Sequence, residues 1–281
     1  MGALYRQATD DLALARRDFP EHNVSRYLNQ LVQQGYARIY VSDNGGLATL
    51  RRFYGRDLPR LFRRLLRYVA LAAFLFYGSA LAMFVTIQAD PNAASLVIDP
   101  RTEDDIRAQR AWWRDLNGQN QTGAATIMTH NLRVAAMAFA GGLSAGAFTV
   151  YVAISNGFSL GAVFGLSFAA GNPWPLAEFV IGHGVLELNE IIFAVASGLL
   201  MGHAILQPGL HSRKTALAIA AGDAIRLMLG TAPVLVVAGL VEGLVSPRPE
   251  IPAILKVSFG LLSGIALYGY LLLSGKPERR A

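Results

Sequence analysis

The sequence predicts an all-α integral membrane protein: a polytopic helix bundle of six spans, one short and one broken, after a small cytoplasmic N-terminal helical region. Mean hydropathy is +0.36. Only 16% of the 281 residues are charged, against about 25% in soluble globular domains. Several uncharged segments approach the roughly 20 apolar residues that a membrane crossing requires. The chain also has no cysteine, which excludes disulfides and thiol chemistry.

The predicted cytoplasmic helical region covers residues 1–66, and the predicted transmembrane bundle covers residues 67–275. Apolar residues of the first region, Val24, Tyr27 and Leu31 among them, recur at helical spacing. Asn156-Gly157 is expected to end the second span, and Gly182-His183-Gly184 to interrupt the fourth. The six predicted spans are residues 68–88, 134–155, 158–170, 176–207, 226–245 and 253–274.

The charge distribution predicts the orientation in the membrane. Residues 51–67 contain seven arginines and one acid, whereas the loop 89–130 contains six acids and four arginines. Because cytoplasmic loops carry the excess of Lys and Arg, we expect both termini in the cytoplasm and the loop outside. Trp112 and Trp113 in that loop favour a helix at the membrane surface. A solvated helix packed on the bundle is the alternative.

Glycines recur at four-residue spacing in the apolar segments, and two more flank His183. Small residues at this spacing let helix backbones approach closely. We expect them to serve packing within one chain, although the same glycine stripes would also suit a homodimer. The candidate packing residues are Gly142, Gly146, Gly157, Gly161, Gly165, Gly182 and Gly184.

The fourth predicted span carries an unusual set of polar residues. His183, Glu187 and Glu190 are spaced i, i+4 and i+7, so they project from one helical face. An ionisable residue inside a bilayer is costly and usually faces the bundle interior or water. With Asn131 and Asn156, which border the predicted spans, these residues form a candidate intramembrane polar site.

Four interpretations of this site remain open: a structural hydrogen-bonded pair, an ion, proton or substrate site, a docking site for a partner, and a metal hydrolase. The pattern His-x-x-x-Glu supplies only one imidazole and one carboxylate, short of the His-Glu-x-x-His pattern of catalytic zinc sites. We therefore expect no catalytic residue, no metal and no cofactor. Glu242 is expected to pair with Lys256 across the loop before the last span.

Several of these residues also occur in motifs of a known family. Asn131, the run Phe139-Ala140-Gly141-Gly142-Leu143, Asn156-Gly157 and Gly182-His183-Gly184-Val185-Leu186-Glu187-Leu188 follow one another in the family's order. With these residues the chain resembles the stage II sporulation protein M family. The segment Arg26–Tyr40 is similar to the cytoplasmic portion of its longer bacterial members. Asn189-Glu190 departs from the small or apolar residues usual at that place.

The resemblance implies a multi-span protein of the bacterial inner (cell) membrane. In spore formers, the namesake of the family works with a pair of membrane-anchored peptidoglycan hydrolases. The resemblance is not taken to imply a role of this chain in spore formation. We therefore expect a non-enzymatic scaffold or regulatory component of an envelope-remodelling assembly, with the lipid bilayer and envelope proteins as partners and no nucleic acid. The alternative is a transporter or channel that uses His183, Glu187 and Glu190.

Overall fold

The computed structural model describes residues 2–40, 46–110 and 120–275, and every regular element in those ranges is a helix. The predicted all-α class is confirmed. The chain folds as two compact units, Met1–Phe53 and Tyr54–Ala281. The boundary between them lies before the predicted one at residue 66, because Leu58 and Phe62 are buried within the second unit.

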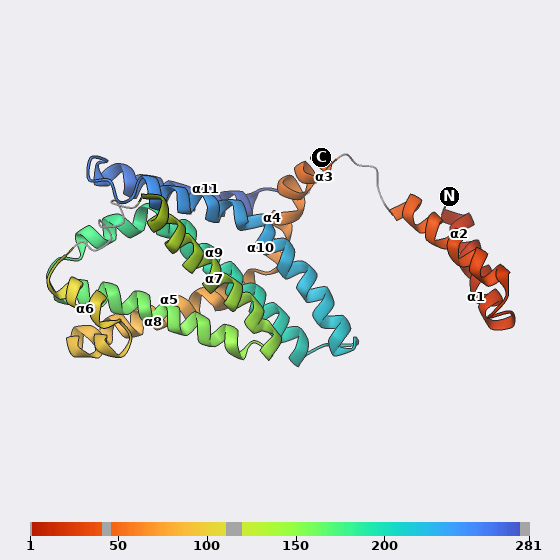
Figure 1. The fold of residues 1–281 in the computed structure, drawn as a ribbon, viewed down its shortest axis with the longest axis horizontal. Coiled ribbons are helices and arrows are strands. Elements are labelled where there is room, and N and C mark those ends of the chain that lie inside the picture. Colours follow the sequence, from red (N-terminus) through yellow and green to blue (C-terminus); the bar gives the residue numbers. More distant parts are fainter. Residues whose placement is uncertain (1, 41–45, 111–119, 276–281) are drawn as a thin grey trace. The chain divides into compact units, whose positions relative to one another are not determined.

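The first unit contains a helical hairpin. Its helices α1 (Gly2–Asp18) and α2 (Asn23–Tyr40) lie side by side (Figure 1), and the short α3 (Gly46–Arg52) follows. The Ser25 hydroxyl donates to the backbone carbonyls of Ala15 (3.0 Å) and Phe19 (2.6 Å), which fixes the connection between α1 and α2. Leu12 and Ala15 are the buried apolar side chains in the described part of the hairpin.

The second unit begins in the π-helical turn η1 (Phe53–Asp57) and contains both short and long helices. Its further elements are α4 (Leu58–Arg64), α5 (Leu66–Ala89), η2 (Pro91–Leu96), α6 (Pro100–Arg107), α7 (Asn120–Ala140), η4 (Gly141–Ser144), α8 (Ala147–Ala169), α9 (Trp174–Leu206), α10 (Arg213–Leu244) and α11 (Ala253–Leu273).

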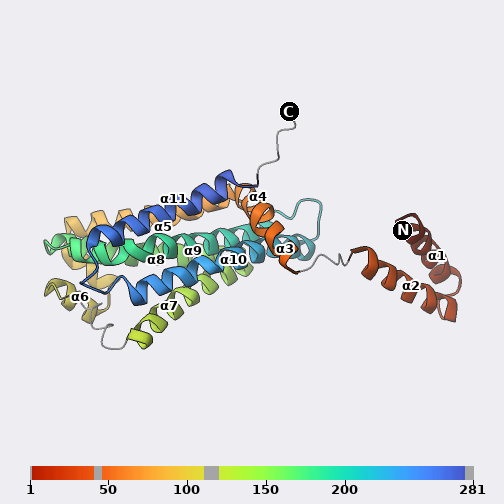
Figure 2. The same cartoon turned by 90° about the horizontal axis from the view of Figure 1, so that it is seen from above.

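Helix α9 is the central element of the second unit. It contacts α5, α7, α8, α10 and α11 (Figure 2). The most apolar 18-residue window of α9 is 78% buried, against 28–44% for the corresponding windows of α5, α8, α10 and α11. Side chains on α9 therefore face protein, whereas much of the apolar surface of the other four helices is free to contact lipid.

Contacts between the helices fix their directions. Ile181 on α9 packs beside Gly260 on α11, and Tyr268 on α11 donates to Asn189, so α9 and α11 run parallel. His183 and Ser246 are in contact at one level, and Met201 packs with Ala220 at another, so α9 and α10 run antiparallel. The long helices α9, α10 and α11 therefore begin and end at the same two ends of the bundle.

One of these ends carries most of the arginines, and we call it the basic end. Arg63 on α4 donates to the carbonyls of Leu271 (3.1 Å) and Ser274 (2.7 Å), which caps the last turn of α11. Arg64 pairs with Asp223 on α10 at 2.7 Å. The opposite end carries η2, α6 and the α10–α11 connection, and we call it the acidic end.

Five helices are long and apolar enough to span a membrane: α5, α8, α9, α10 and α11. Helix α7 is of similar length but contains His130, Asn131 and Arg133, and it is not among the five. The six predicted spans are roughly in line with these helices, although the continuous α8 covers parts of two of them, 134–155 and 158–170. The chain is a membrane protein with a bundle of apolar helices.

The helix boundaries between residues 120 and 170 differ from the predicted ones. Ala145 (φ 55°) and Gly146 (φ 87°) have left-handed backbones, and the chain turns there, inside the predicted span 134–155. At Asn156-Gly157 the predicted break is absent, and α8 is continuous. The amide of Asn156 donates to the Val152 carbonyl of its own helix, so this polar side chain does not interrupt α8.

Helix α9 is also continuous through Gly182-His183-Gly184, where we expected an interruption. A glycine in a helix interior costs only about 1 kcal/mol relative to alanine. Packing of the buried Gly182 against Ser246 and Lys256 easily offsets such a cost. Helix α10 likewise begins at Arg213 rather than at the predicted residue 226, because Ser212 caps it by accepting from the Thr215 amide (3.2 Å).

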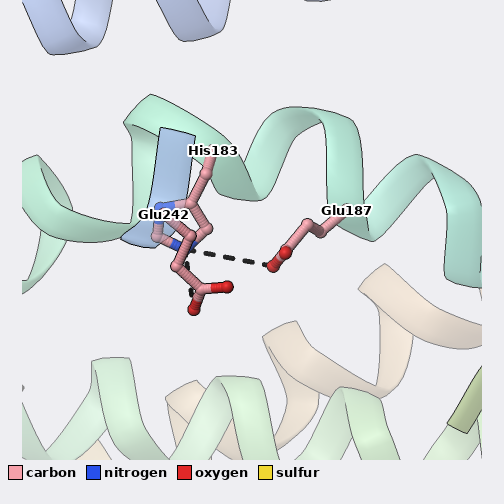
Figure 3. Close-up of side chains that lie close together, drawn as sticks. All are labelled: His183, Glu187 and Glu242. Carbon is pink, nitrogen blue, oxygen red and sulfur yellow. Dashed lines mark ion pairs between the residues drawn. The ribbon is translucent and has the colours of Figure 1, made fainter. Parts of the chain in front are cut away.

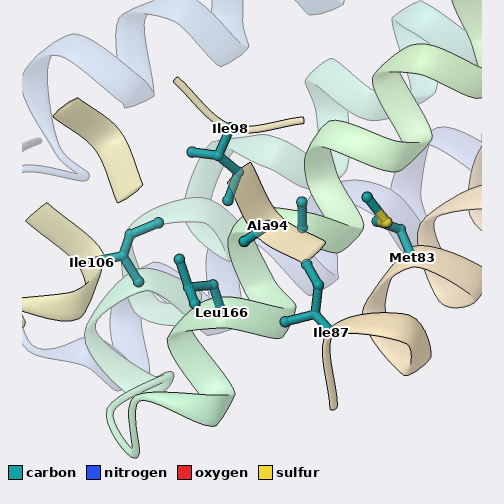
Figure 4. Close-up of a cluster of buried hydrophobic side chains, with 7 residues drawn as sticks. Met83, Ile87, Ala94, Ile98, Ile106 and Leu166 are labelled. Carbon is teal, nitrogen blue, oxygen red and sulfur yellow. The ribbon is translucent and has the colours of Figure 1, made fainter. Parts of the chain in front are cut away.

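The outer part of the acidic end forms its own apolar cluster. Ile106 of α6 packs with Ile98, Ala94, Ile87 of α5 and Leu166 of α8 (Figure 4). The described part of the predicted loop helix is therefore packed on the bundle, as in the alternative interpretation. The two predicted tryptophan anchors of this loop lie outside the described residues.

Candidate functional site

Three ionisable side chains from α9 and α10 meet near the acidic end of the bundle. His183 and Glu187 are one turn apart on α9, and Glu242 is in the last turn of α10. The Nε2 atom of His183 lies 3.7 Å from Oε1 of Glu242 and 4.0 Å from Oε2 of Glu187 (Figure 3). The exposed fraction of each residue is between 3% and 5%. We call these three residues the His–Glu cluster.

Neighbouring polar side chains orient two members of the cluster. The Nδ1 atom of His183 lies 2.9 Å from Oγ of Ser246, just after α10. The amide Nδ2 of Asn131 on α7 donates to Oε2 of Glu187 at 2.8 Å. The site therefore joins α7, α9 and the end of α10, which places the predicted residues Asn131, His183 and Glu187 together.

Two oxygens of the cluster have no hydrogen-bond partner among the described residues: Oε1 of Glu187 and Oε2 of Glu242. Buried polar atoms in folded proteins are nearly always paired. An imidazole nitrogen and two carboxylates are also metal ligands, and one such atom from each member lies within 4.8 Å of the others. The arrangement of these ligand atoms therefore allows the cluster to coordinate a cation.

Glu190 shares the helix face of Glu187 but has a different partner. Thr231 on α10 donates to its Oε2 atom at 2.9 Å, and the residue is 2% exposed. A second polar contact at this level is the hydrogen bond from Tyr268 on α11 to Asn189. Glu190 and Asn189 thus tie α9 to α10 and α11, outside the His–Glu cluster.

The expected pairing of Glu242 with Lys256 is wrong. The Nζ atom of Lys256 lies 2.9 Å from Oε1 of Glu178 at the start of α9, while Glu242 contacts His183. The reason is the parallel packing of α9 and α11, which places Lys256 beside the first turns of α9. Lys256 is 3% exposed.

Asn156 is not part of the site. Its amide donates to the Val152 carbonyl on α8 at 2.8 Å, and none of its described contacts is with the His–Glu cluster. The prediction placed Asn156 at a helix end, where its side chain would be available. It lies inside a continuous helix, and the side chain bonds to its own backbone instead.

The residues of the site fall within a region that matches a known family. A family model described as stage II sporulation protein M matches residues 70–247. The chain belongs to the stage II sporulation protein M family. The matched region extends from α5 through the connection after α10, so it contains Asn131, Ser246 and all three residues of the His–Glu cluster.

The hairpin of this family member is matched separately. A model described as a domain of unknown function (DUF8413) covers residues 1–41. This match agrees with the division of the chain into two compact units. No curated protein and no solved structure matches the chain.

The predicted packing glycines lie at close helix contacts in this family member. A Cβ atom on Gly161 would lie 2.0 Å from the Ala80 carbonyl oxygen, and one on Gly142 would lie 2.6 Å from that of Gly198. Gly157 and Gly165 also face α5, Gly146 faces Gly202, and Gly182 faces Ser246, whereas Gly184 is close to Val180 of its own helix. Most of these glycines serve packing within one chain, so they give no support to a homodimer.

Glu242, Ser246 and Thr231 are site residues that the sequence prediction did not assign to the site. Glu242 is the single charged residue between Arg226 and Arg248. The rule that singled out Glu187, that an acid in an apolar segment faces the protein interior, applies equally to Glu242. Ser246 and Thr231 carry no comparable signal, because hydroxyls are common in membrane helices.

Proposed function

We propose that this member of the stage II sporulation protein M family is not an enzyme but a scaffold or regulatory component of an envelope-remodelling assembly. Its place would be the bacterial inner membrane, with both termini in the cytoplasm. The observation that carries this proposal is the combination of a membrane bundle with a separate helical hairpin that leaves apolar side chains exposed.

The described part of the hairpin buries few apolar side chains. Leu12 and Ala15 are buried, whereas Leu4 (71%), Phe19 (61%) and Tyr27 (63%) are largely exposed. Small domains bury a low fraction of their surface and often depend on a partner. Exposed aromatic and aliphatic side chains on such a unit suit the binding of another envelope protein.

The bundle supports an anchoring role. Its central helix α9 is held by buried polar contacts to α7, α10 and α11, from Asn131, Thr231 and Tyr268 respectively. Polar contacts between apolar helices fix their packing. A bundle fixed in this way would hold the hairpin at the membrane without a chemical step of its own.

The distribution of charge supports the proposed orientation. Arg60, Arg63, Arg64 and Arg67 lie at the start of α5 or just before it, and Arg213 begins α10 at the same basic end. Positively charged residues near helix ends favour the cytoplasmic side. The hairpin precedes these arginines in the chain, so it would also be cytoplasmic.

Transport through the polar residues of α9 is not favoured. His183, Glu187 and Glu190 are each at most 5% exposed, and each contacts a protein side chain. A transport site must be reached by water from at least one side. Burial of the same residues also restricts access by the substrate of an enzyme.

The double variant Phe19→Ser/Tyr27→Ser tests the proposal in the full chain. In the membranes of its own host, chemical crosslinking of the wild type should recover membrane-anchored envelope proteins, peptidoglycan hydrolases among them. The double variant should insert into the membrane equally well, yet recover these proteins at a small fraction of the wild-type level. Because the hairpin is a separate unit, the stability of the bundle should not change.

The matched control is Gln7→Ser/Gln30→Ser, which alters two exposed polar residues of the same hairpin. It should recover the partners as well as the wild type does. If the Phe19/Tyr27 variant recovers the same partners at the same level, the hairpin is not the docking unit. If the wild type recovers none, or if the purified chain moves protons across liposome membranes in a Glu187-dependent manner, the scaffold proposal fails.

A further inference from the structure

The described residues supply no cationic side chain that would balance two ionised carboxylates in the His–Glu cluster. Glu187 and Glu242 place two carboxylates around one imidazole, and all three residues are at least 95% buried. A buried ionised carboxylate is costly unless it is paired or coordinates a cation, and otherwise it takes up a proton. Among the residues that the structure describes, His183 is the single basic side chain within 4.0 Å of either carboxylate.

The nearest buried cationic residue of α11 is already engaged. Lys256 pairs with Glu178 at 2.9 Å. Glu178 precedes His183 on α9 by more than one helical turn. A lysine ion pair therefore neutralises Glu178 and not the cluster. A divalent cation, in contrast, would balance both carboxylates while the imidazole remains neutral.

The imidazole of His183 is oriented as a ligand. Its Nδ1 atom lies 2.9 Å from Oγ of Ser246. In the tautomer with the proton on Nδ1, this N–H donates to the hydroxyl and Nε2 keeps its lone pair. The Nε2 atom is the one that faces both carboxylates. Metal-ligating histidines are typically held by such a hydrogen bond from the other ring nitrogen.

The carboxylates of Glu187 and Glu242 are the other two candidate ligands. Asn131 donates to Oε2 of Glu187, which fixes that side chain from α7. The remaining oxygens, Oε1 of Glu187 and Oε2 of Glu242, are buried and have no hydrogen-bond donor among the described residues. These two acceptors are an observation independent of the charge count. The oxygens nearest to Nε2 of His183 are Oε2 of Glu187 and Oε1 of Glu242, so a cation satisfies the unpaired acceptors where each carboxylate binds it through both oxygens.

We propose that His183, Glu187 and Glu242 bind a divalent transition-metal ion, with zinc as the representative. Zinc bound at about 2.0–2.2 Å in tetrahedral geometry places its ligand atoms roughly 3.5 Å apart. The observed separations of 3.7 and 4.0 Å need a contraction of only a few tenths of an ångström. The imidazole favours zinc and its neighbours over magnesium or calcium, which prefer oxygen ligands.

Such an ion would join α9 to the end of α10 and, through Asn131, to α7. This inference goes beyond the proposed function, because a scaffold requires no metal and the hairpin that carries the docking proposal contributes no ligand. Metal binding and partner binding are therefore tested on different residues. Loss of one leaves the other unaffected.

The test is metal uptake by the full chain in lipid nanodiscs. The protein is stripped with a chelator, loaded with zinc, desalted, and analysed by elemental mass spectrometry. The wild type should retain zinc in an equimolar amount and should unfold at a higher temperature with zinc than without. His183→Ala, Glu187→Gln and Glu242→Gln should each weaken zinc binding by roughly tenfold or more.

Glu190→Gln is the matched control, because Glu190 is an equally buried carboxylate on the same helix that bonds to Thr231 instead. It should bind zinc as the wild type does. Cobalt in place of zinc gives a second readout, since a visible absorption band of the wild type should be absent in Glu242→Gln.

Two results would overturn the proposal. In the first, the stripped wild type takes up no zinc and its unfolding temperature does not respond to zinc, which would show that the cluster is not a zinc site. In the second, Glu190→Gln loses as much zinc as Glu242→Gln. The wild-type measurement decides the question even if a cluster variant fails to fold.

Discussion

The Nζ atom of Lys256 on α11 lies 2.9 Å from Oε1 of Glu178 on α9, and this lysine is only 3% exposed. The pair joins two parallel helices near the acidic end of the bundle. Its members are unequal, since the side chain of Glu178 is 26% exposed. Removing one partner therefore has a different cost from removing the other.

Glu178→Gln should destabilise the protein more than Lys256→Met does. The first variant leaves a buried ammonium group without its carboxylate, at a cost of about 3–5 kcal/mol. The second leaves a carboxylate that water can reach, and the methionine side chain fills the space of the lysine. Thermal unfolding of the full chain in one detergent should show the larger decrease in Tm for Glu178→Gln.

The double variant Glu178→Gln/Lys256→Met provides the control. It has no uncompensated charge, so its Tm should lie above that of Glu178→Gln alone. Equal losses from the two single variants, with additive loss in the double variant, would show that the two charges do not interact in the folded protein.

The sequence predicted the part of the site that lies on one helix. His183 and Glu187 are one turn apart on α9, and helical periodicity alone places them on one face. Glu242 reaches them because α10 packs antiparallel to α9, and periodicity within one segment contains no information on this contact. Its position as a lone acid in an apolar segment was the available signal.

The helix boundaries show a similar limit. Gly-containing segments were expected to interrupt spans at Asn156-Gly157 and at Gly182, whereas the turn occurs at Ala145 and Gly146. The glycines inside α8 and α9 are accommodated because other backbones pack directly against them. Sequence patterns identify a glycine, but tertiary contacts determine whether it breaks a helix or packs within one.

Gly161→Ala should separate α8 from α5. The added Cβ would lie 2.0 Å from the backbone carbonyl oxygen of Ala80, and backbone cannot move away as a flexible side chain can. Overpacking of this kind costs about 1–3 kcal/mol. The Tm of the full chain should fall accordingly.

Gly78→Ala is the matched control on α5, because nothing lies within 4 Å of its Cβ position. There the substitution should be neutral or stabilise the helix by up to about 1 kcal/mol. A decrease in Tm of equal size in both variants would contradict close packing at Gly161.

The stability of α6 should depend on pH in the acid range because Asp99 caps the start of this helix. A hydrogen bond from the Thr102 side chain holds the pKa of the Asp99 carboxyl below its usual 3.8, and the backbone amides of Arg101 and Thr102 add to the effect. Because the pKa of Asp99 is lower in the folded than in the unfolded state, the ionised cap stabilises α6 at pH values above the unfolded-state pKa. That stabilisation is lost as the pH falls through the folded pKa.

Hydrogen exchange of the α6 amides, corrected for intrinsic rates, should therefore show constant protection down to about pH 4 and a decrease below it. Asp99→Asn keeps an acceptor that does not titrate, so its protection should not decrease in the same range. Asp99→Ala should lose about 1 kcal/mol of helix stability at neutral pH. An acid-induced loss in Asp99→Asn that equals the wild-type loss would exclude the cap as its cause.

The orientation of the bundle can be measured with single cysteines, because the natural chain contains none. Ser95 in η2 and His211 before α10 are both exposed and lie at opposite ends of the bundle. If the basic end faces the cytoplasm, a membrane-impermeant maleimide should label Ser95→Cys in intact spheroplasts. It should label His211→Cys only after the membrane is opened. The reverse pattern would invert the proposed topology. Labelling of both sites in intact spheroplasts would show that α7, α8 and α9, the long helices between the two sites, do not each cross the membrane.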